Sequence, residues 1–245
     1  MVEFIRNRKK VLVGGHRGCV CRHFENTIPA MEQALADGAD YLEIDIQITR
    51  DGEIVVYHDT ELSKKTSLKG YVHSYTCQEL KAAVPQLNTL KEVLAWAKQR
   101  QAYLMLEMKS VPLDMQGQCM LLAGELVKLV REQKMQGQVL AFGADYMVLR
   151  HLKQLDPSFP IGLIVPFVPS DPVKLMEEMD AVLYLSYVYN MTEDIVERLH
   201  QAGYLVDGAI LRDAKWVRRA KDLGVDMYES DYPGRESDIN PCYDV

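Results

Sequence analysis

Two short stretches of the sequence carry side chains that could perform proton transfer and bind a phosphate. The segment GGHRG holds His16 and Arg17, and the segment LEIDIQITRDGEIVVYHD holds Glu43, Asp45 and His58. An imidazole transfers protons near neutral pH, and a guanidinium presents a planar fork to phosphate oxygens. Carboxylates are preferred ligands of hard divalent cations. The two stretches therefore indicate metal-assisted acid–base chemistry.

The acidic side chains share one side of a predicted strand. Over residues 41–48 apolar and polar residues alternate, so Glu43 and Asp45 point the same way, about 7 Å apart along the strand. A second predicted strand, 102–108, places Glu107 on its polar side in the same manner. Three carboxylates at the carboxyl ends of neighbouring strands predict a site for one divalent cation, Mg²⁺ or Ca²⁺.

A buried network of ion pairs is the alternative explanation of these acids. Arg17 and Lys109 could neutralise them without a metal. Two cations do not balance three carboxylates, however, and the interior of a barrel is usually filled by bulky apolar side chains. We therefore favour the bound cation, and we expect Arg17 and Lys109 to contact the phosphate of a substrate.

The histidines at positions 16 and 58 each follow a predicted strand, so both can reach the same rim as the acids. One neutral imidazole can accept a proton from an attacking hydroxyl while a protonated one donates to the leaving oxygen. His16 and His58 are accordingly predicted to act as an acid–base pair. Loop or packing positions are expected for His23, His73, His151 and His200.

The elements that position these residues alternate regularly between strand and helix. Eight β-rich runs separated by amphipathic helical stretches are typical of parallel βα units, and they predict a closed α/β barrel. The strands are expected near 11–15, 41–48, 102–108, 138–142, 160–165, 181–185, 203–207 and 225–229. After the second strand, Asp51-Gly52 predicts a hairpin with EIVVYHD as its returning arm. A loop-like insertion is then expected at about 60–88, at the mouth of the barrel. The chain is expected to form one domain, 1–245.

Composition and charge exclude several classes of protein. A net charge of -7 without a basic stripe argues against nucleic-acid binding. No apolar run approaches the ~20 residues of a membrane span, and MVEFIRNRKK lacks the apolar stretch of a signal peptide, so we expect a cytoplasmic protein. The five cysteines show no disulfide spacing. Cys19 and Cys21 with His23 could hold a soft metal, but a closed site needs a fourth ligand, so free thiols are favoured.

Several stretches together resemble the glycerophosphodiester phosphodiesterase family. They are HRG, ENTIPAMEQALADGADYLEIDIQITRDGEIVVYHD, TLKEVLAWA, LEMK and, more weakly, GVDMYESDYP. The resemblance implies a TIM (β/α)8 barrel with a small insertion after the second strand. It implies metal-dependent hydrolysis of a small-molecule glycerophosphodiester to glycerol 3-phosphate and an alcohol. The matching site residues are His16 and His58 as the acid–base pair, Glu43, Asp45 and Glu107 as metal ligands, and Arg17 and Lys109 as phosphate contacts.

Three departures from the family's pattern concern the substrate pocket. Phe24 stands where a proline usually precedes Glu-Asn-Thr, Ala141 stands where a serine is common, and the seventh strand, GYLVDGAIL, lacks a tryptophan. We expect these positions to line the pocket for the glycerol or the alcohol. Two alternatives stay open: the same chemistry on lysophospholipids or other phosphodiesters, and a non-catalytic barrel that binds a metal or a phosphorylated ligand.

Overall fold

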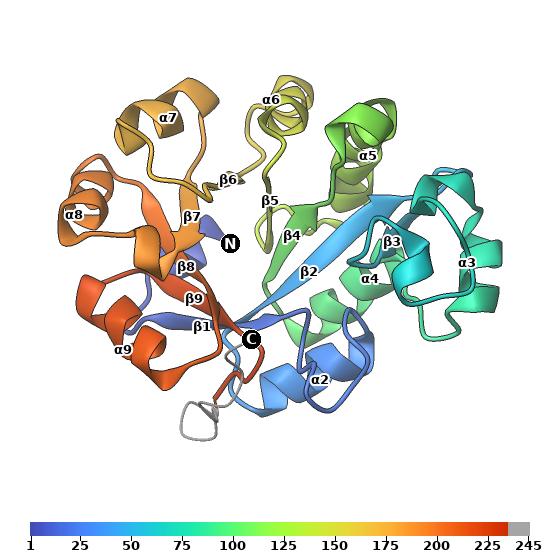
Figure 1. The fold of residues 1–245 in the computed structure, drawn as a ribbon, viewed down its shortest axis with the longest axis horizontal. Coiled ribbons are helices and arrows are strands. Elements are labelled where there is room, and N and C mark those ends of the chain that lie inside the picture. The colour runs from blue at the N-terminus through green and yellow to red at the C-terminus, as the bar shows by residue number, and fades with distance from the viewer. Residues whose placement is uncertain (235–245) are drawn as a thin grey trace.

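Eight parallel strands close into a barrel, as the sequence predicts. The computed structural model describes residues 1–234, apart from the side chains of residues 112 and 113. The first strand pairs with the second on one side and with the ninth on the other, which closes the ring, and the third strand is an antiparallel addition beyond the second (Figure 1). The strands are β1 (Leu12–His16), β2 (Tyr41–Ile48), β3 (Ile54–Val56), β4 (Leu104–Met108), β5 (Val139–Gly143), β6 (Ile161–Ile164), β7 (Leu183–Tyr187), β8 (Leu205–Leu211) and β9 (Met227–Ser230).

Helices surround the ring of strands (Figure 1). They are α1 (Val2–Arg6), α2 (Ile28–Ala36), α3 (Cys77–Ala83), α4 (Leu90–Arg100), α5 (Pro112–Gln133), α6 (Tyr146–Leu155), α7 (Pro172–Met179), α8 (Glu193–Gln201) and α9 (Ala214–Leu223). Among those described, none has both the length and the apolar character needed to cross a bilayer. The sequence did not predict α1. Its Ile5 is buried and the ring of Phe4 stacks on Tyr103 at 3.9 Å, so α1 lies at the amino ends of the strands, opposite the predicted site.

Alternation along the strands sorts the core into two layers. The predicted helix-facing residues of β2 and β4 belong to the large outer core: Leu42, Ile44, Ile46, Ile48, Leu104, Leu106 and Met108. A second cluster fills the barrel interior and includes Tyr41, Met105, Phe142 and Leu185. The predicted sides of β2 and β4 are therefore confirmed. The expectation for Ala141 is wrong, because this residue is buried in the outer layer and faces the helices rather than the pocket.

The insertion after β2 starts with the predicted hairpin. Ile46 pairs with Val56 and Ile48 with Ile54, so β3 runs antiparallel to β2. The stretch 60–88, predicted as loop-like, contains α3 and two 3₁₀ helices, η1 (Leu62–Lys64) and η2 (Val72–Ser74), packed over a small core of their own. A capping box starts α3, and this Thr-x-x-Glu signal was present in the sequence at 76–79.

Candidate functional site

Strand register brings the predicted acids together at the carboxyl end of the barrel. His16 on β1 lies opposite Glu43 on β2, and Asp45 lies opposite Glu107 on β4. One oxygen from each of the three carboxylates lies within 4.8 Å of the other two. Glu43 and Asp45 are buried, and Glu107 is half-buried. The site therefore offers a compact set of oxygen ligands of the kind that hard divalent cations prefer.

Two cations contact these acids, as the ion-pair alternative requires. Lys109 Nζ lies 2.7 Å from Glu107 Oε1 and 3.4 Å from Asp45 Oδ1, while Arg17 Nε lies 3.4 Å from Asp45 Oδ2. Glu43 Oε1 nevertheless is buried and has no hydrogen-bond partner in the described part of the chain. An orphaned buried carboxylate oxygen is costly unless a proton or a cation satisfies it. The residues thus fit a bound cation in addition to the two side-chain cations.

The three acids differ in their proton affinity. Burial first, and then the neighbouring Asp45 and Glu107, raise the pKa of Glu43 well above its usual value. Burial and Asp45 likewise raise the pKa of Glu107. Burial acts in the same direction on Asp45, but Lys109 and Arg17 outweigh it and lower the pKa of that carboxyl. A divalent ion that binds here would therefore compete with protons for Glu43 and Glu107.

The loop after β1 fixes two of the acids. Arg17 and Asn26 adopt left-handed backbone conformations, with φ of 56° and 61°, which residues other than glycine rarely do. The Arg17 N–H donates to the main-chain oxygen of Glu43 at 2.9 Å and to its Oε2 at 3.0 Å. The Asn26 amide donates to Asp45 Oδ2 at 2.7 Å and its oxygen accepts from the Asp45 N–H at 3.1 Å. These hydrogen bonds offset the cost of the two left-handed conformations and orient the side chains of Glu43 and Asp45.

His16 is held by Asp231, a residue that the sequence analysis missed. Its Nδ1 lies 2.5 Å from Asp231 Oδ1, and Arg212 Nε donates to the other oxygen, Oδ2, at 2.5 Å. Although burial acts to raise it, the bonds from His16 and Arg212 lower the pKa of Asp231 to about 2. Because Asp231 is ionised, Nδ1 of His16 donates to it, and Nε2 faces Glu43 Oε2 at 4.0 Å. An acid two residues beyond the last predicted strand, 225–229, was the available signal.

His58 leaves β3 in a segment that Gln47 anchors. The Gln47 amide donates to the main-chain oxygens of Tyr57 at 2.7 Å and Asp59 at 3.1 Å. His58 Nδ1 lies 3.2 Å from Asp59 Oδ1. Burial, reinforced by Lys109 and Arg17, lowers the pKa of His58. A lowered pKa makes the protonated imidazole a stronger acid.

Glu25 joins His58 and Asp59 in a second group whose ligand atoms lie within 4.8 Å of one another. Cations of the chain already contact these carboxylates. Lys65 Nζ lies 2.5 Å from Glu25 Oε1 and 3.3 Å from Asp59 Oδ2, and Arg17 donates to Glu25 Oε2 at 3.1 Å. This group is therefore an ion-pair cluster, and the group around Glu43 is the better candidate for a metal.

Two further buried acids inside the barrel were also missed. Asp207 on β8 accepts a bond from the Tyr41 hydroxyl at 3.4 Å, and Glu229 on β9 is 3% exposed. Burial raises the pKa of Asp207 to about 8 and raises that of Glu229 well above its usual value. Both carboxyls therefore hold a proton more tightly than a free carboxyl does, and Asp207, with a pKa of about 8, adds little negative charge beside Glu43 at neutral pH. The alternation of the last two strands could have placed them inside.

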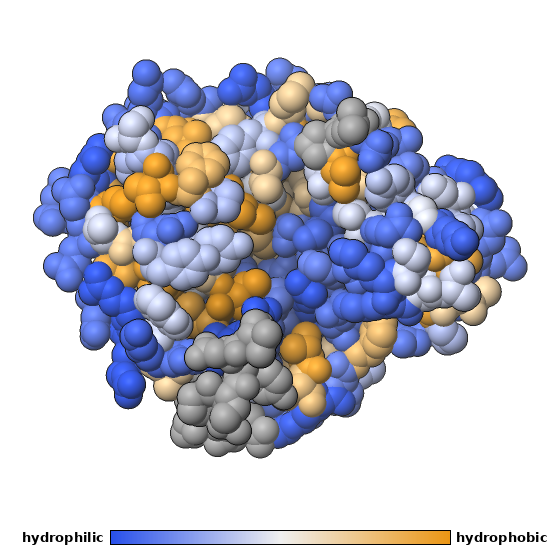
Figure 2. All heavy atoms as spheres, viewed as in Figure 1, coloured by the Kyte–Doolittle hydropathy of each residue, from blue (hydrophilic) through white to orange (hydrophobic). Residues whose placement is uncertain are grey.

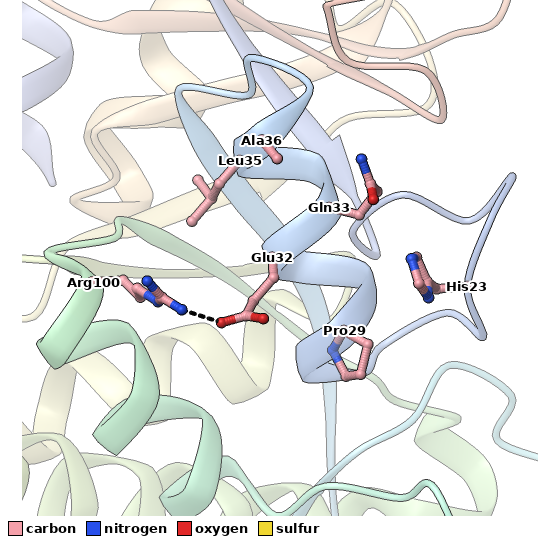
Figure 3. Close-up of a pocket in the computed structure, with 7 residues that line it drawn as sticks. All are labelled: His23, Pro29, Glu32, Gln33, Leu35, Ala36 and Arg100. Atoms are coloured by element: carbon pink, nitrogen blue, oxygen red, sulfur yellow. Dashed lines mark hydrogen bonds and ion pairs between the residues drawn. The ribbon is translucent and has the colours of Figure 1, made fainter.

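The first-loop thiols lie outside this site. Cys19 and Cys21 are free, with their sulfurs 3.3 Å apart, and neither belongs to a group within residues 1–234 that could hold a metal. His23 instead lines a pocket of about 610 Å³ on the outer side of α2, where Glu32 and Arg100 form an ion pair at 2.5 Å (Figure 3). None of the predicted site residues lines that pocket. Cys242 lies outside the described residues.

Comparison with known proteins agrees with the geometry. The model of the Glycerophosphoryl diester phosphodiesterase family matches residues 16–235. A glycerophosphodiester phosphodiesterase of Caldanaerobacter subterraneus subsp. tengcongensis is 27% identical over 235 residues, which cover 91% of this chain and 95% of the relative. A Bacillus altitudinis enzyme of the same name is 26% identical, covering 90% and 94%. The crystallised phosphodiesterase of Oleispira antarctica, in complex with the product sn-glycerol-3-phosphate, superimposes with a TM-score of 0.84 at 25% identity, covering 93% and 96%.

Proposed function

Because the chain belongs to the glycerophosphoryl diester phosphodiesterase family and is a phosphoric diester hydrolase, we propose that it releases glycerol 3-phosphate from small glycerophosphodiesters at the site around Glu43. One observation carries this proposal. Two imidazoles, three carboxylates and two side-chain cations occupy the carboxyl end of a barrel, where enzymes of this architecture have their active sites. A binding module would not require paired proton carriers.

Glu43, Asp45 and Glu107 would hold one divalent cation, Mg²⁺ or Ca²⁺. When bound, such an ion supplies positive charge that stabilises the phosphoryl oxygens as negative charge builds up in the transition state. The unpartnered oxygen of Glu43 and the excess of three acids over two cations support this assignment.

Arg17 and Lys109 would hold the phosphate of the substrate. Both side chains reach the same carboxylate, Asp45, so their positive ends converge on one point of the rim. The guanidinium can contact two phosphate oxygens at once, and the ammonium adds a point charge. Nearby Asn26 would keep Asp45 in place while substrate competes for these cations.

His16 and His58 would divide the proton transfers between them. Nε2 of His16, with its lone pair oriented by the Asp231 bond to Nδ1, would take the proton of an attacking glycerol hydroxyl. The attack would form a cyclic phosphate that water then opens. His58, whose protonated form is a strengthened acid, would donate to the departing alcohol oxygen.

The proposal is tested by glycerol 3-phosphate release from a panel of diesters, which includes glycerophosphocholine and its acylated counterpart. We expect release that stops with a chelator, returns with Mg²⁺ or Ca²⁺, and is lost in His16→Ala. Preference for the acylated compound would favour lysophospholipids as substrates. Tight binding of every diester without any release would refute a catalytic role.

A further inference from the structure

An exposed apolar surface lies on one side of the barrel mouth. It is carried by the loops after β6 and β7, and these loops touch, since the Asn190 amide donates to the main-chain oxygen of Pro166 at 3.0 Å. Figure 2 shows apolar residues gathered on the α7 and α8 side of this face, with hydrophilic residues on the side of β2 and β3. The exposed side chains on these loops are Phe167 (58%), Val168 (58%), Tyr187 (40%) and Tyr189 (63%).

Aromatic rings connect this surface with the interior of the mouth. Tyr187 continues the inward-facing series of Leu183 and Leu185 along β7, both of which belong to the inner core. Its ring stacks on Tyr189 with centroids 5.0 Å apart, and Tyr189 meets the ring of Trp216 edge-on at 6.0 Å. We call Phe167, Val168, Tyr187, Tyr189 and Trp216 the aromatic rim.

Basic side chains border the aromatic rim, although the chain as a whole carries a net charge of -7. Lys215 Nζ lies 5.0 Å from the centroid of the Trp216 ring, and Arg218 is exposed on the same helix, α9. Tyrosine and tryptophan rings are enriched where membranes meet water, and neighbouring basic groups are attracted to anionic lipid headgroups. The rim therefore has both components that contact with an anionic lipid surface requires.

We propose that the aromatic rim docks the mouth of the barrel onto a lipid surface that contains anionic phospholipid. The contact is peripheral: side chains from two loops and from the start of α9 enter the headgroup region, while the barrel stays in water. A protein docked in this way has the mouth of its barrel turned toward the lipid layer, where it can reach diesters that lie in the layer or have just left it. This goes beyond hydrolysis of a diester free in solution.

The two tryptophans of the chain allow a direct test. Trp96→Phe leaves Trp216 as the single tryptophan, which can be excited at wavelengths that tyrosine does not absorb. Trp96 lies on α4 and is hydrogen-bonded to Glu32. With vesicles of phosphatidylcholine and phosphatidylglycerol, we expect the emission of Trp216 to shift to the blue and to be quenched by bromine on the acyl chains. Unchanged emission together with no co-sedimentation would overturn the proposal.

Substitutions in the aromatic rim, compared with one at an exposed apolar residue elsewhere, test whether vesicle binding depends on the rim. Phe167→Ser and Tyr189→Ser should each weaken vesicle partitioning about tenfold. Leu121→Ser, at a 64% exposed site on α5, should leave it unchanged. An equal loss in this control, or equal binding to vesicles of phosphatidylcholine alone, would contradict the assignment. If the wild type does not bind vesicles but forms a dimer that both rim variants abolish, the rim contacts a second copy of the chain and the lipid proposal is refuted.

Turnover separates this inference from the proposed function. Phe167 and Tyr189 lie outside the group of acids, imidazoles and cations at the mouth, so both serine variants should hydrolyse a water-soluble diester at the wild-type rate. Loss of vesicle binding with normal turnover is the expected pattern. A parallel loss of turnover in both variants would contradict a role in docking alone.

Discussion

Asp231, which the sequence analysis missed, is predicted to orient His16 for catalysis, and substitution of this aspartate tests that role. Asp231→Asn keeps the size of the side chain but removes the charge that orients the imidazole over a 2.5 Å contact. A hydrogen bond to a charged group is worth about 1.5–3 kcal/mol. We therefore expect kcat to fall about 10- to 150-fold. KM should change little, because Asp231 contacts neither Arg17 nor Lys109.

The same substitution has a consequence for stability with a defined pH dependence. The pKa of Asp231 is lowered to about 2, so its interactions stabilise the fold above the unfolded pKa of about 3.9 and lose this effect as pH falls through 2. The shift corresponds to about 2 kcal/mol. Urea unfolding at pH 7 should show that loss in Asp231→Asn, and unfolding near pH 2 should not.

Asp226→Asn is the matched control, because Asp226 directly precedes β9 as Asp231 directly follows it. Asp226 is buried and accepts bonds from His200 and the Val206 N–H, away from His16. This variant should lose stability yet keep kcat per folded molecule. Equal losses of kcat in Asp226→Asn and Asp231→Asn would refute the orientation of His16 by its aspartate.

Three further substitutions test other parts of the site. His58→Ala should reduce turnover of diesters with poor leaving groups far more than that of an activated nitrophenyl diester, and equal losses would contradict its role as the acid. Arg17→Lys should raise KM about tenfold, measured by steady-state kinetics, because an ammonium cannot contact two phosphate oxygens in the same way; an unchanged KM would remove Arg17 from the phosphate site. Asp207→Asn should raise the free energy of unfolding by about 5 kcal/mol at pH 8 and little at pH 4, because the raised pKa of Asp207 costs stability only where the unfolded carboxyl is ionised. A gain that does not depend on pH would contradict this reasoning.

The alternation of β2 and β4 made the acids predictable from the sequence. A strand has a period of two, so once Leu42 and Ile44 are assigned to the helix-facing layer, Glu43 and Asp45 must point inward. The neighbouring strand places Glu107 beside Asp45 by the same rule. The hairpin at Asp51-Gly52 was also predictable, because these two adjacent residues alone favour the tight turn between its strands.

Contacts between residues far apart in the chain were not accessible in this way. His16 and Asp231 are separated by 215 positions, and only the closure of β1 against β9 brings them together. Arg212 follows an irregular stretch of β8 between Gly208 and Leu211, which no periodic pattern encodes. The buried Asp207 and Glu229 depend on the inner layer of the whole barrel. The domain span of 1–245 and the roles of the site residues stay predictions.

Binding of a divalent ion, measured by titration calorimetry on chelator-treated protein, tests the central claim most directly. We predict one ion per chain, with proton release that reflects the raised pKa values of Glu43 and Glu107. Glu43→Gln should abolish this binding, whereas Glu25→Gln, in the neighbouring ion-pair cluster, should retain it. Binding that survives Glu43→Gln and disappears in Glu25→Gln, or no binding in the wild type, would contradict the account.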